Sequence, residues 1–157
     1  MKITLIQIGK TEEKYLLEGI DKFEKRLKHY INFSSITIPA LKNTKNMSVT
    51  EQKKKEGELL LKLIHNSDHL ILLDEQGKEF GSSAFSAYLN NHMNKAVQHL
   101  VFVIGGPYGF DSRVYDRANE KISLSKMTFS HQMVRLFFTE QLYRSFTILK
   151  GEPYHHE

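Results

Sequence analysis

The stretch TFSHQMVR, residues 128–135, places several polar side chains at the start of the most apolar helix that the sequence predicts. Polar groups gathered at the boundary of an element mark a binding or catalytic site more often than a core. The polar members of this stretch are Thr128, Ser130, His131, Gln132 and Arg135. Two interpretations stay open for His131, which either belongs to such a site or is a packing residue with satisfied ring nitrogens.

A second candidate site is the glycine loop in VFVIGGPYG, residues 101–109, where an apolar run stops at a glycine pair. The pattern predicts a buried strand that ends in a tight loop, with room for a close approach to the backbone. It is not a P-loop, because neither a lysine nor a hydroxyl residue follows the glycines as that motif requires. It also departs from the dinucleotide fingerprint, since Pro107 removes a backbone donor that a phosphate cradle would use. A plain strand-to-helix turn is the alternative.

Strand-like and helix-like segments alternate along the chain. Strands are expected at residues 2–8, 33–38, 69–73, 101–104 and 122–124, and helices from about 16, 49, 83, 112 and 131. Ser48 and Ser130 have the type and position of helix N-caps, and Ser82 or Ser83 is expected to cap a third helix. The alternation predicts an α/β fold, with a largely parallel sheet flanked by helices.

Two strand ends of this sheet carry glycine turns, LLDEQGK at residues 72–78 and the loop after residue 104. Ligands of open α/β sheets bind beyond the carboxyl ends of the strands. The two turns are therefore expected to border one pocket.

Composition limits the class of protein. The 157 residues, 40% apolar and 25% charged, fit one globular domain spanning residues 1–157. Cysteine is absent, which excludes thiolate metal sites and cysteine nucleophiles and suits a cytoplasmic protein. No run approaches the roughly 20 apolar residues of a membrane span. We expect neither a membrane nor a metal ion as a partner.

The net charge of +4 is unevenly distributed. Residues 1–62 hold 13 Lys/Arg against 8 Asp/Glu, whereas residues 63–157 hold 9 against 10. The excess includes Lys53, Lys54 and Lys55. It indicates either solvated helix faces or a weak nucleic-acid footprint.

Several segments are distinctive in combination: MKITLIQIGK, KKEGELLL, LLDEQGK, VFVIGGPYG, SLSKMTFSHQMVR, EQLYR and PYHHE. They cover nearly the whole chain, and together they resemble the RlmH family, SPOUT-class methyltransferases of the large ribosomal subunit RNA. The resemblance implies a sheet whose C-terminal part forms a deep trefoil knot, an S-adenosylmethionine pocket in that knot, and a homodimer. It also implies methylation at N3 of a pseudouridine in 23S rRNA on the assembled ribosome.

The resemblance assigns residues to the cofactor pocket. These are Leu73, Gly105, Leu124, Ser125, Lys126, Met127, Thr128 and Phe129. A methionine–adenosine ligand has no phosphate, so apolar walls and extended loops that offer backbone donors and acceptors suit it.

The terminal Tyr154-His155 pair matches a family signature, which makes His155 the candidate general base or, alternatively, an RNA contact. Tyr154 is expected to stack on a base and Arg135 to hold a phosphate or a base carbonyl, with an ion pair to Glu140 or the tail as the alternative for Arg135. His156 stands where family members commonly carry arginine, which weakens the cation expected for RNA binding at neutral pH.

The last helix is apolar on more than one side, because Leu136, Phe137 and Tyr143 lie off its main stripe. This favours a subunit contact over an unusually deep core. Two other functions stay open: a SPOUT methyltransferase of another RNA target, and a ribosome-binding factor without enzymatic activity.

Overall fold

The computed structural model describes residues 1–156 and contains one five-stranded sheet in the strand order β2-β1-β4-β3-β5. Every pairing of neighbouring strands is parallel, as predicted. The elements are β1 (Lys2–Ile8), α1 (Lys14–Leu27), β2 (Asn32–Ile38), α2 (Val49–Leu61), β3 (His69–Glu79), α3 (Ser82–Asn94), β4 (His99–Ile104), α4 (Ser112–Arg117), β5 (Glu120–Ser123) and α5 (His131–Leu149). A short 3₁₀ turn, Thr44–Asn46, interrupts the loop before α2.

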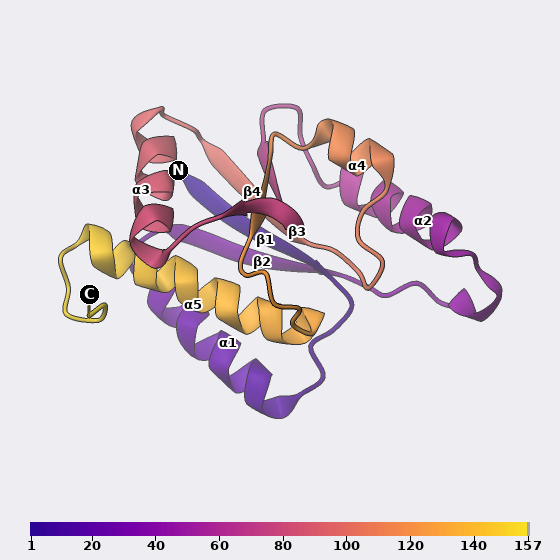
Figure 1. Ribbon diagram of the computed structural model, residues 1–157, viewed down its shortest axis with the longest axis horizontal. Helices are drawn as coiled ribbons and strands as arrows, with labels where there is room; N and C mark the ends of the chain where they lie inside the picture. Colours follow the sequence, from indigo (N-terminus) through magenta and orange to yellow (C-terminus); the bar gives the residue numbers. More distant parts are fainter. Residues whose placement is uncertain (157) are drawn as a thin grey trace.

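Helices cover both faces of the sheet. Helices α1, α3 and α5 pack on one face, and α2 and α4 lie on the other (Figure 1). Each face of the sheet has its own hydrophobic core, and strand β4 contributes to both. Leu100, Phe102 and Ile104 pack in the core on the side of α1, α3 and α5. Val101 and Val103 pack in the core on the side of α2 and α4. A continuous apolar run whose successive residues point to opposite faces is typical of a strand buried on both faces.

The N-termini of the helices follow local capping chemistry in two of three predicted cases. The backbone N–H of Glu51 donates to Ser48 Oγ, and the backbone N–H of Met133 donates to Ser130 Oγ. The prediction of Ser82 or Ser83 as the cap of α3 was wrong. Gly81 occupies the cap position, and Ser82 Oγ instead donates to Gln141 Oε1 at 2.8 Å, which ties α3 to α5.

Strand β3 is longer than the predicted strand 69–73, because it curls across β5. Ile122 of β5 pairs with Leu73 and again with Lys78, with a register break between them. A Cβ built on Gly77 would lie 2.4 Å from the carbonyl carbon of Ile122. The backbones therefore cross in near contact at Gly77, which only glycine permits. Among residues 1–156, no helix has the length and apolar character to cross a bilayer.

Candidate functional site

The carboxyl ends of β4, β3 and β5 meet at one edge of the sheet. Leu73 pairs with Ile104 on one side and with Ile122 on the other. The predicted meeting of the two glycine turns is confirmed, because both border one cavity of about 630 Å³ beyond these strand ends. We call it the strand-end cavity. It is lined by Leu73, Asp74, Glu75, Gln76, Ile104, Gly105, Gly106, Pro107, Tyr108, Gly109, Phe110, Tyr115, Phe129, Ser130, His131 and Val134.

The glycine loop forms one wall of this cavity as a closed turn. The backbone N–H of Gly109 donates to the carbonyl oxygen of Gly106 at 3.2 Å, and Gly109 has a φ of +79° that favours glycine. A Cβ on Gly105 would lie 3.0 Å from the ring of Phe110, and one on Gly106 would lie 2.8 Å from Glu56 Oε2. The side chains of Phe110 and Glu56 are therefore the groups that lie close to the backbone of Gly105 and Gly106.

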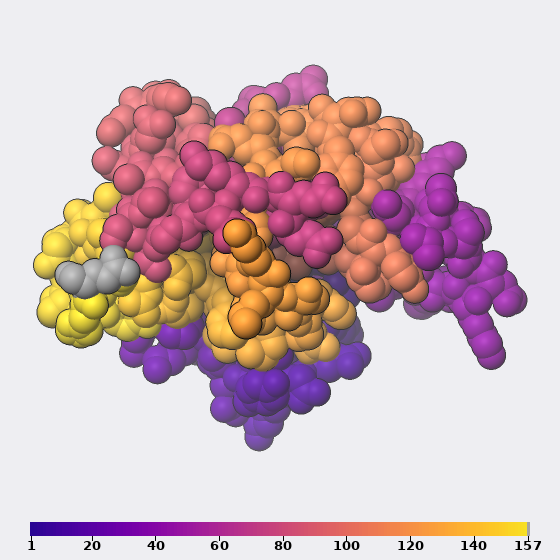
Figure 2. Space-filling model, in the orientation of Figure 1, coloured from indigo at the N-terminus to yellow at the C-terminus, as the bar shows by residue number. Residues whose placement is uncertain are grey.

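The loop between β5 and α5, residues 124–130, forms the opposite wall and stands out at the surface beside the end of β3 (Figure 2). Its backbone is held by Ser125, whose carbonyl accepts from Ser123 Oγ and whose own Oγ accepts from the backbone N–H of Met127. A smaller cavity of about 130 Å³ lies under this loop and shares Leu73 and Phe129 with the strand-end cavity. The loop therefore connects two parts of one concave surface.

Most of the predicted cofactor residues meet at this surface. Leu73, Gly105 and Phe129 line the strand-end cavity, and Leu124, Ser125, Met127 and Thr128 line the smaller one. Met127 is 75% exposed, so its side chain contributes little wall within a single chain. Lys126 lines neither cavity and is exposed.

Two carboxylates, which the sequence interpretation did not include, lie at the strand-end cavity. Asp74 and Glu75 follow Leu73 directly, and Asp74 accepts hydrogen bonds from the Tyr115 hydroxyl and from the backbone N–H of Gln76. Burial together with the hydrogen bond to Asp74 raises the pKa of Tyr115 to about 12, so the hydroxyl stays protonated as the donor. Among the described residues, no lysine or arginine lines this cavity. Its charge suits a cationic ligand and opposes a phosphate.

His131 is the histidine that lines the strand-end cavity. Burial, with a smaller effect from the nearby positive charge of Arg135, lowers its pKa below the ordinary value. The imidazole is therefore neutral at neutral pH, the form that can accept a proton.

Arg135 is buried, which does not suit the direct RNA contact predicted for it. Its side chain is 1% exposed, and it donates to the carbonyl oxygen of Ile8 at 2.7 Å and to Thr11 Oγ1 at 2.8 Å. It fastens α5 to the end of β1. Within residues 1–156 Arg135 forms no ion pair, and Glu140 is paired with Arg144 at 2.6 Å instead.

The tail folds back on the C-terminal half of α5. Tyr154 donates through its hydroxyl to Glu140 Oε1 at 3.0 Å, and the guanidinium of Arg144 lies over the Tyr154 ring at 4.7 Å. His155 Nδ1 lies 3.1 Å from Arg144 Nη1, and His156 is exposed. Arg144 lies 13 positions after His131, about 20 Å along the helix axis, so one chain holds His155 far from its own cavity.

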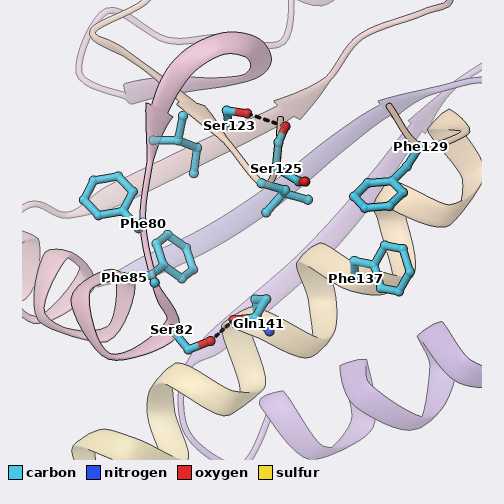
Figure 3. Close-up of a pocket in the computed structure, with 11 residues that line it drawn as sticks. Phe80, Ser82, Phe85, Ser123, Ser125, Phe129, Phe137 and Gln141 are labelled. Carbon is cyan, nitrogen blue, oxygen red and sulfur yellow. Dashed lines mark hydrogen bonds between the residues drawn. The ribbon is translucent and has the colours of Figure 1, made fainter. Parts of the chain in front are cut away.

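An apolar pocket of about 310 Å³ lies on the other side of the loop 124–129. Phe80, Phe85, Phe129 and Phe137 surround it, and the Ser82–Gln141 hydrogen bond closes one end (Figure 3). The rings of Phe129 and Phe137 meet edge to face at 5.1 Å, and Phe137 is 37% exposed.

Leu136 and Tyr143, two of the three apolar residues of α5 outside its main apolar stripe, contact other parts of the same chain. Leu136 lies against Gly19 of α1, and Tyr143 contacts Phe23 and Tyr154. Leu136 and Tyr143 are therefore partly covered within the chain, whereas Phe137 is exposed.

Comparisons with known proteins agree with this geometry. The family model described as "Predicted SPOUT methyltransferase" matches residues 1–155. A protein of Christiangramia forsetii named "Ribosomal RNA large subunit methyltransferase H" is 61% identical over 156 residues, covering 99% of each chain. A protein of the same name from Parabacteroides distasonis is 59% identical over 157 residues, covering both chains completely. The chain therefore belongs to the SPOUT methyltransferase family and, within it, to the large-subunit methyltransferase H group that its motifs resemble.

Proposed function

We propose that this chain transfers a methyl group from S-adenosylmethionine to N3 of a pseudouridine in 23S rRNA, on the assembled ribosome in the cytoplasm. The observation that carries the proposal is the strand-end cavity, which combines a glycine loop and apolar strand ends with two carboxylates and, among the described residues, neither lysine nor arginine. S-adenosylmethionine carries a sulfonium and an ammonium group and no phosphate. The residues present therefore fit this cofactor better than they fit a nucleotide.

The cofactor supplies an electrophilic methyl group that needs no further activation, so the chain must bind it and align it with the attacking nitrogen. Leu73 and Leu124 offer apolar walls, and the backbone of Gly105 and of residues 125–129 offers donors and acceptors for the adenine and ribose. Asp74 and Glu75 would complement the positive charges. Lys126 is an exposed member of the same loop and joins the site only if the loop closes on the ligand.

A homodimer would complete the site. His155 and Tyr154 lie about 20 Å along α5 from His131, so the tail of one subunit would serve the cavity of the other. The pocket around Phe137 supports this arrangement, since an exposed aromatic side chain beside an apolar pocket is typical of a protein interface.

Removal of the N3 proton needs a base with a pKa near neutrality. His155 is the proposed base, delivered by the partner subunit. Tyr154 and His156 would contact the RNA, whereas the buried Arg135 would act indirectly, by holding the start of α5 against β1.

We also propose that the curl of β3 is part of a trefoil knot. The close approach of Gly77 to Ile122 supports it, because β3 curls around β5 so that Leu73 and Lys78 both pair with Ile122. An experimental structure with a continuous backbone trace tests this topology.

The function is tested by incubating the purified protein and methyl-labelled S-adenosylmethionine with ribosomes from a strain that lacks the corresponding gene. We expect one label per ribosome, at N3 of a pseudouridine in 23S rRNA, and none on isolated 23S rRNA. Label on another RNA or nitrogen would favour a SPOUT enzyme of different target. Binding to ribosomes without any transfer, together with no binding of the cofactor, would favour a non-enzymatic ribosome-binding factor.

A further inference from the structure

Three side chains that commonly bind metals meet at the amino ends of β3 and β5, the end of the strands opposite the strand-end cavity. His69 is the first residue of β3, His92 lies in the last turn of α3, and Glu120 is the first residue of β5. His69 Nε2 lies 2.6 Å and His92 Nε2 lies 3.2 Å from the same oxygen, Glu120 Oε1. One ligand atom from each residue lies within 4.8 Å of the other two.

The cluster has a buried side and an open side. The side chain of His92 is only 8% exposed, and its ring packs against those of His69 and Tyr88, each at 4.7 Å. The side chains of His69 and Glu120 are 25% and 35% exposed, so solvent and a small ion can reach them. Among residues 1–156, the buried His92 Nδ1 finds no hydrogen-bond partner.

We propose that His69, His92 and Glu120 form a binding site for a divalent cation of the zinc class. Two imidazole nitrogens and one carboxylate oxygen are a common ligand set for Zn²⁺, with water in the fourth position. Ligand atoms about 2.05 Å from a tetrahedral ion lie about 3.3 Å apart. The separation of 3.2 Å between His92 Nε2 and Glu120 Oε1 already matches, and that between His69 and Glu120 needs to lengthen by less than 1 Å.

The ion would have three protein ligands and one position open to water. It would join α3 to the starts of β3 and β5, and it would leave the strand-end cavity untouched at the other end of these strands. The sequence predicts no metal site, because these ligands lie 23 and 28 residues apart and no short motif unites them.

The test is a titration of the chelator-treated protein with Zn²⁺ in competition with a coloured chelator. We expect one ion per chain, and a Co²⁺ complex with the strong visible absorption of tetrahedral coordination. His69→Gln, at a partly exposed position, should weaken Zn²⁺ binding at least about 100-fold, since loss of a mere supporting contact already costs 10–100-fold. His29→Gln, which changes an exposed histidine outside the cluster, should bind as the wild type does.

Thermal unfolding separates loss of a ligand from loss of the fold. Zn²⁺ should raise the midpoint of the wild type and of His29→Gln but not that of His69→Gln or of the near-isosteric Glu120→Gln. If the wild type binds no stoichiometric Zn²⁺, or if folded His69→Gln and Glu120→Gln bind it as tightly as the wild type, the proposal is wrong.

Discussion

Because β3 crosses β5 in near contact at Gly77, we expect that any side chain at this position destabilises the fold. In Gly77→Ala the new methyl carbon would lie 2.4, 2.5 and 2.6 Å from three backbone atoms of Ile122. Backbone that is hydrogen-bonded in a sheet cannot rotate away as a side chain can, so the strands must separate by about 1 Å to reach an ordinary contact. Overpacking typically costs 1–3 kcal/mol, and we expect about 3 kcal/mol here because the neighbour is rigid. For a chain of this length that lowers the unfolding midpoint by about 6–12 °C.

Gly81→Ala is the matched control, because a Cβ at Gly81 meets nothing within 4 Å and its φ is −71°. We expect it to cost less than about 1 kcal/mol, the usual range for a change of helix N-cap. Urea unfolding of both variants, monitored by circular dichroism, gives the free energies of unfolding. Equal stabilities of Gly77→Ala and Gly81→Ala would show that the backbones do not cross as described.

Three further changes test other parts of the account. Phe137→Glu places a charge on the exposed ring beside the apolar pocket, so the dimer should dissociate and methyl transfer should fall with it; a dimer that persists in light scattering would exclude this surface. His155→Ala should lower the single-turnover rate on saturating ribosomes about 10²–10⁴-fold and regain rate as pH rises, because more substrate then ionises unaided; a rate near wild type would refute its role as base. Burial raises the pKa of Glu56 above 4.5 despite the hydrogen bond from Gln52, so the folded state holds its proton more tightly than the unfolded state does. The wild type should therefore lose stability relative to Glu56→Gln as pH rises from about 4 through the raised pKa. Urea unfolding of both proteins across a pH series measures this loss. If the difference between their free energies of unfolding does not change with pH, the carboxyl of Glu56 is not buried as described.

The sheet and its helices could be predicted because their signals are local. The apolar run at residues 101–104 lies within one strand, and the stripe from Val134 to Leu149 lies within one helix, so both predictions hold in the structure. Ser48 and Ser130 cap helices as predicted, since a cap depends on the next three residues alone. Ser82 does not cap α3, because its hydroxyl donates instead to the side chain of Gln141, 59 residues away.

The parts of the site that depend on distant pairing could not be predicted. Gly77 resembles an ordinary turn residue, and its role depends on Ile122, which the curl of β3 brings against it. In the sequence Arg135 has the position of an exposed cation at the start of a helix. In the structure its guanidinium is buried and donates to the carbonyl oxygen of Ile8 at the end of β1. The carboxylates after Leu73 had a signal, since acidic residues directly after a buried strand lie where ligands bind. The structure adds that no lysine or arginine of the described part of the chain lines the cavity beside them.

The most direct test of the central claim is calorimetric titration of S-adenosylmethionine into the wild type and into the double variant Asp74→Asn/Glu75→Gln. Two unit charges about 7 Å apart interact by about 0.6 kcal/mol in water and about 2.4 kcal/mol at an effective dielectric constant of 20. We therefore expect one cofactor per cavity in the wild type and binding about tenfold weaker or more in the double variant. Asp116→Asn, outside the cavity, should match the wild type. If the wild type binds no cofactor, or the double variant binds it equally well, the cavity is not the site of a cationic methyl donor.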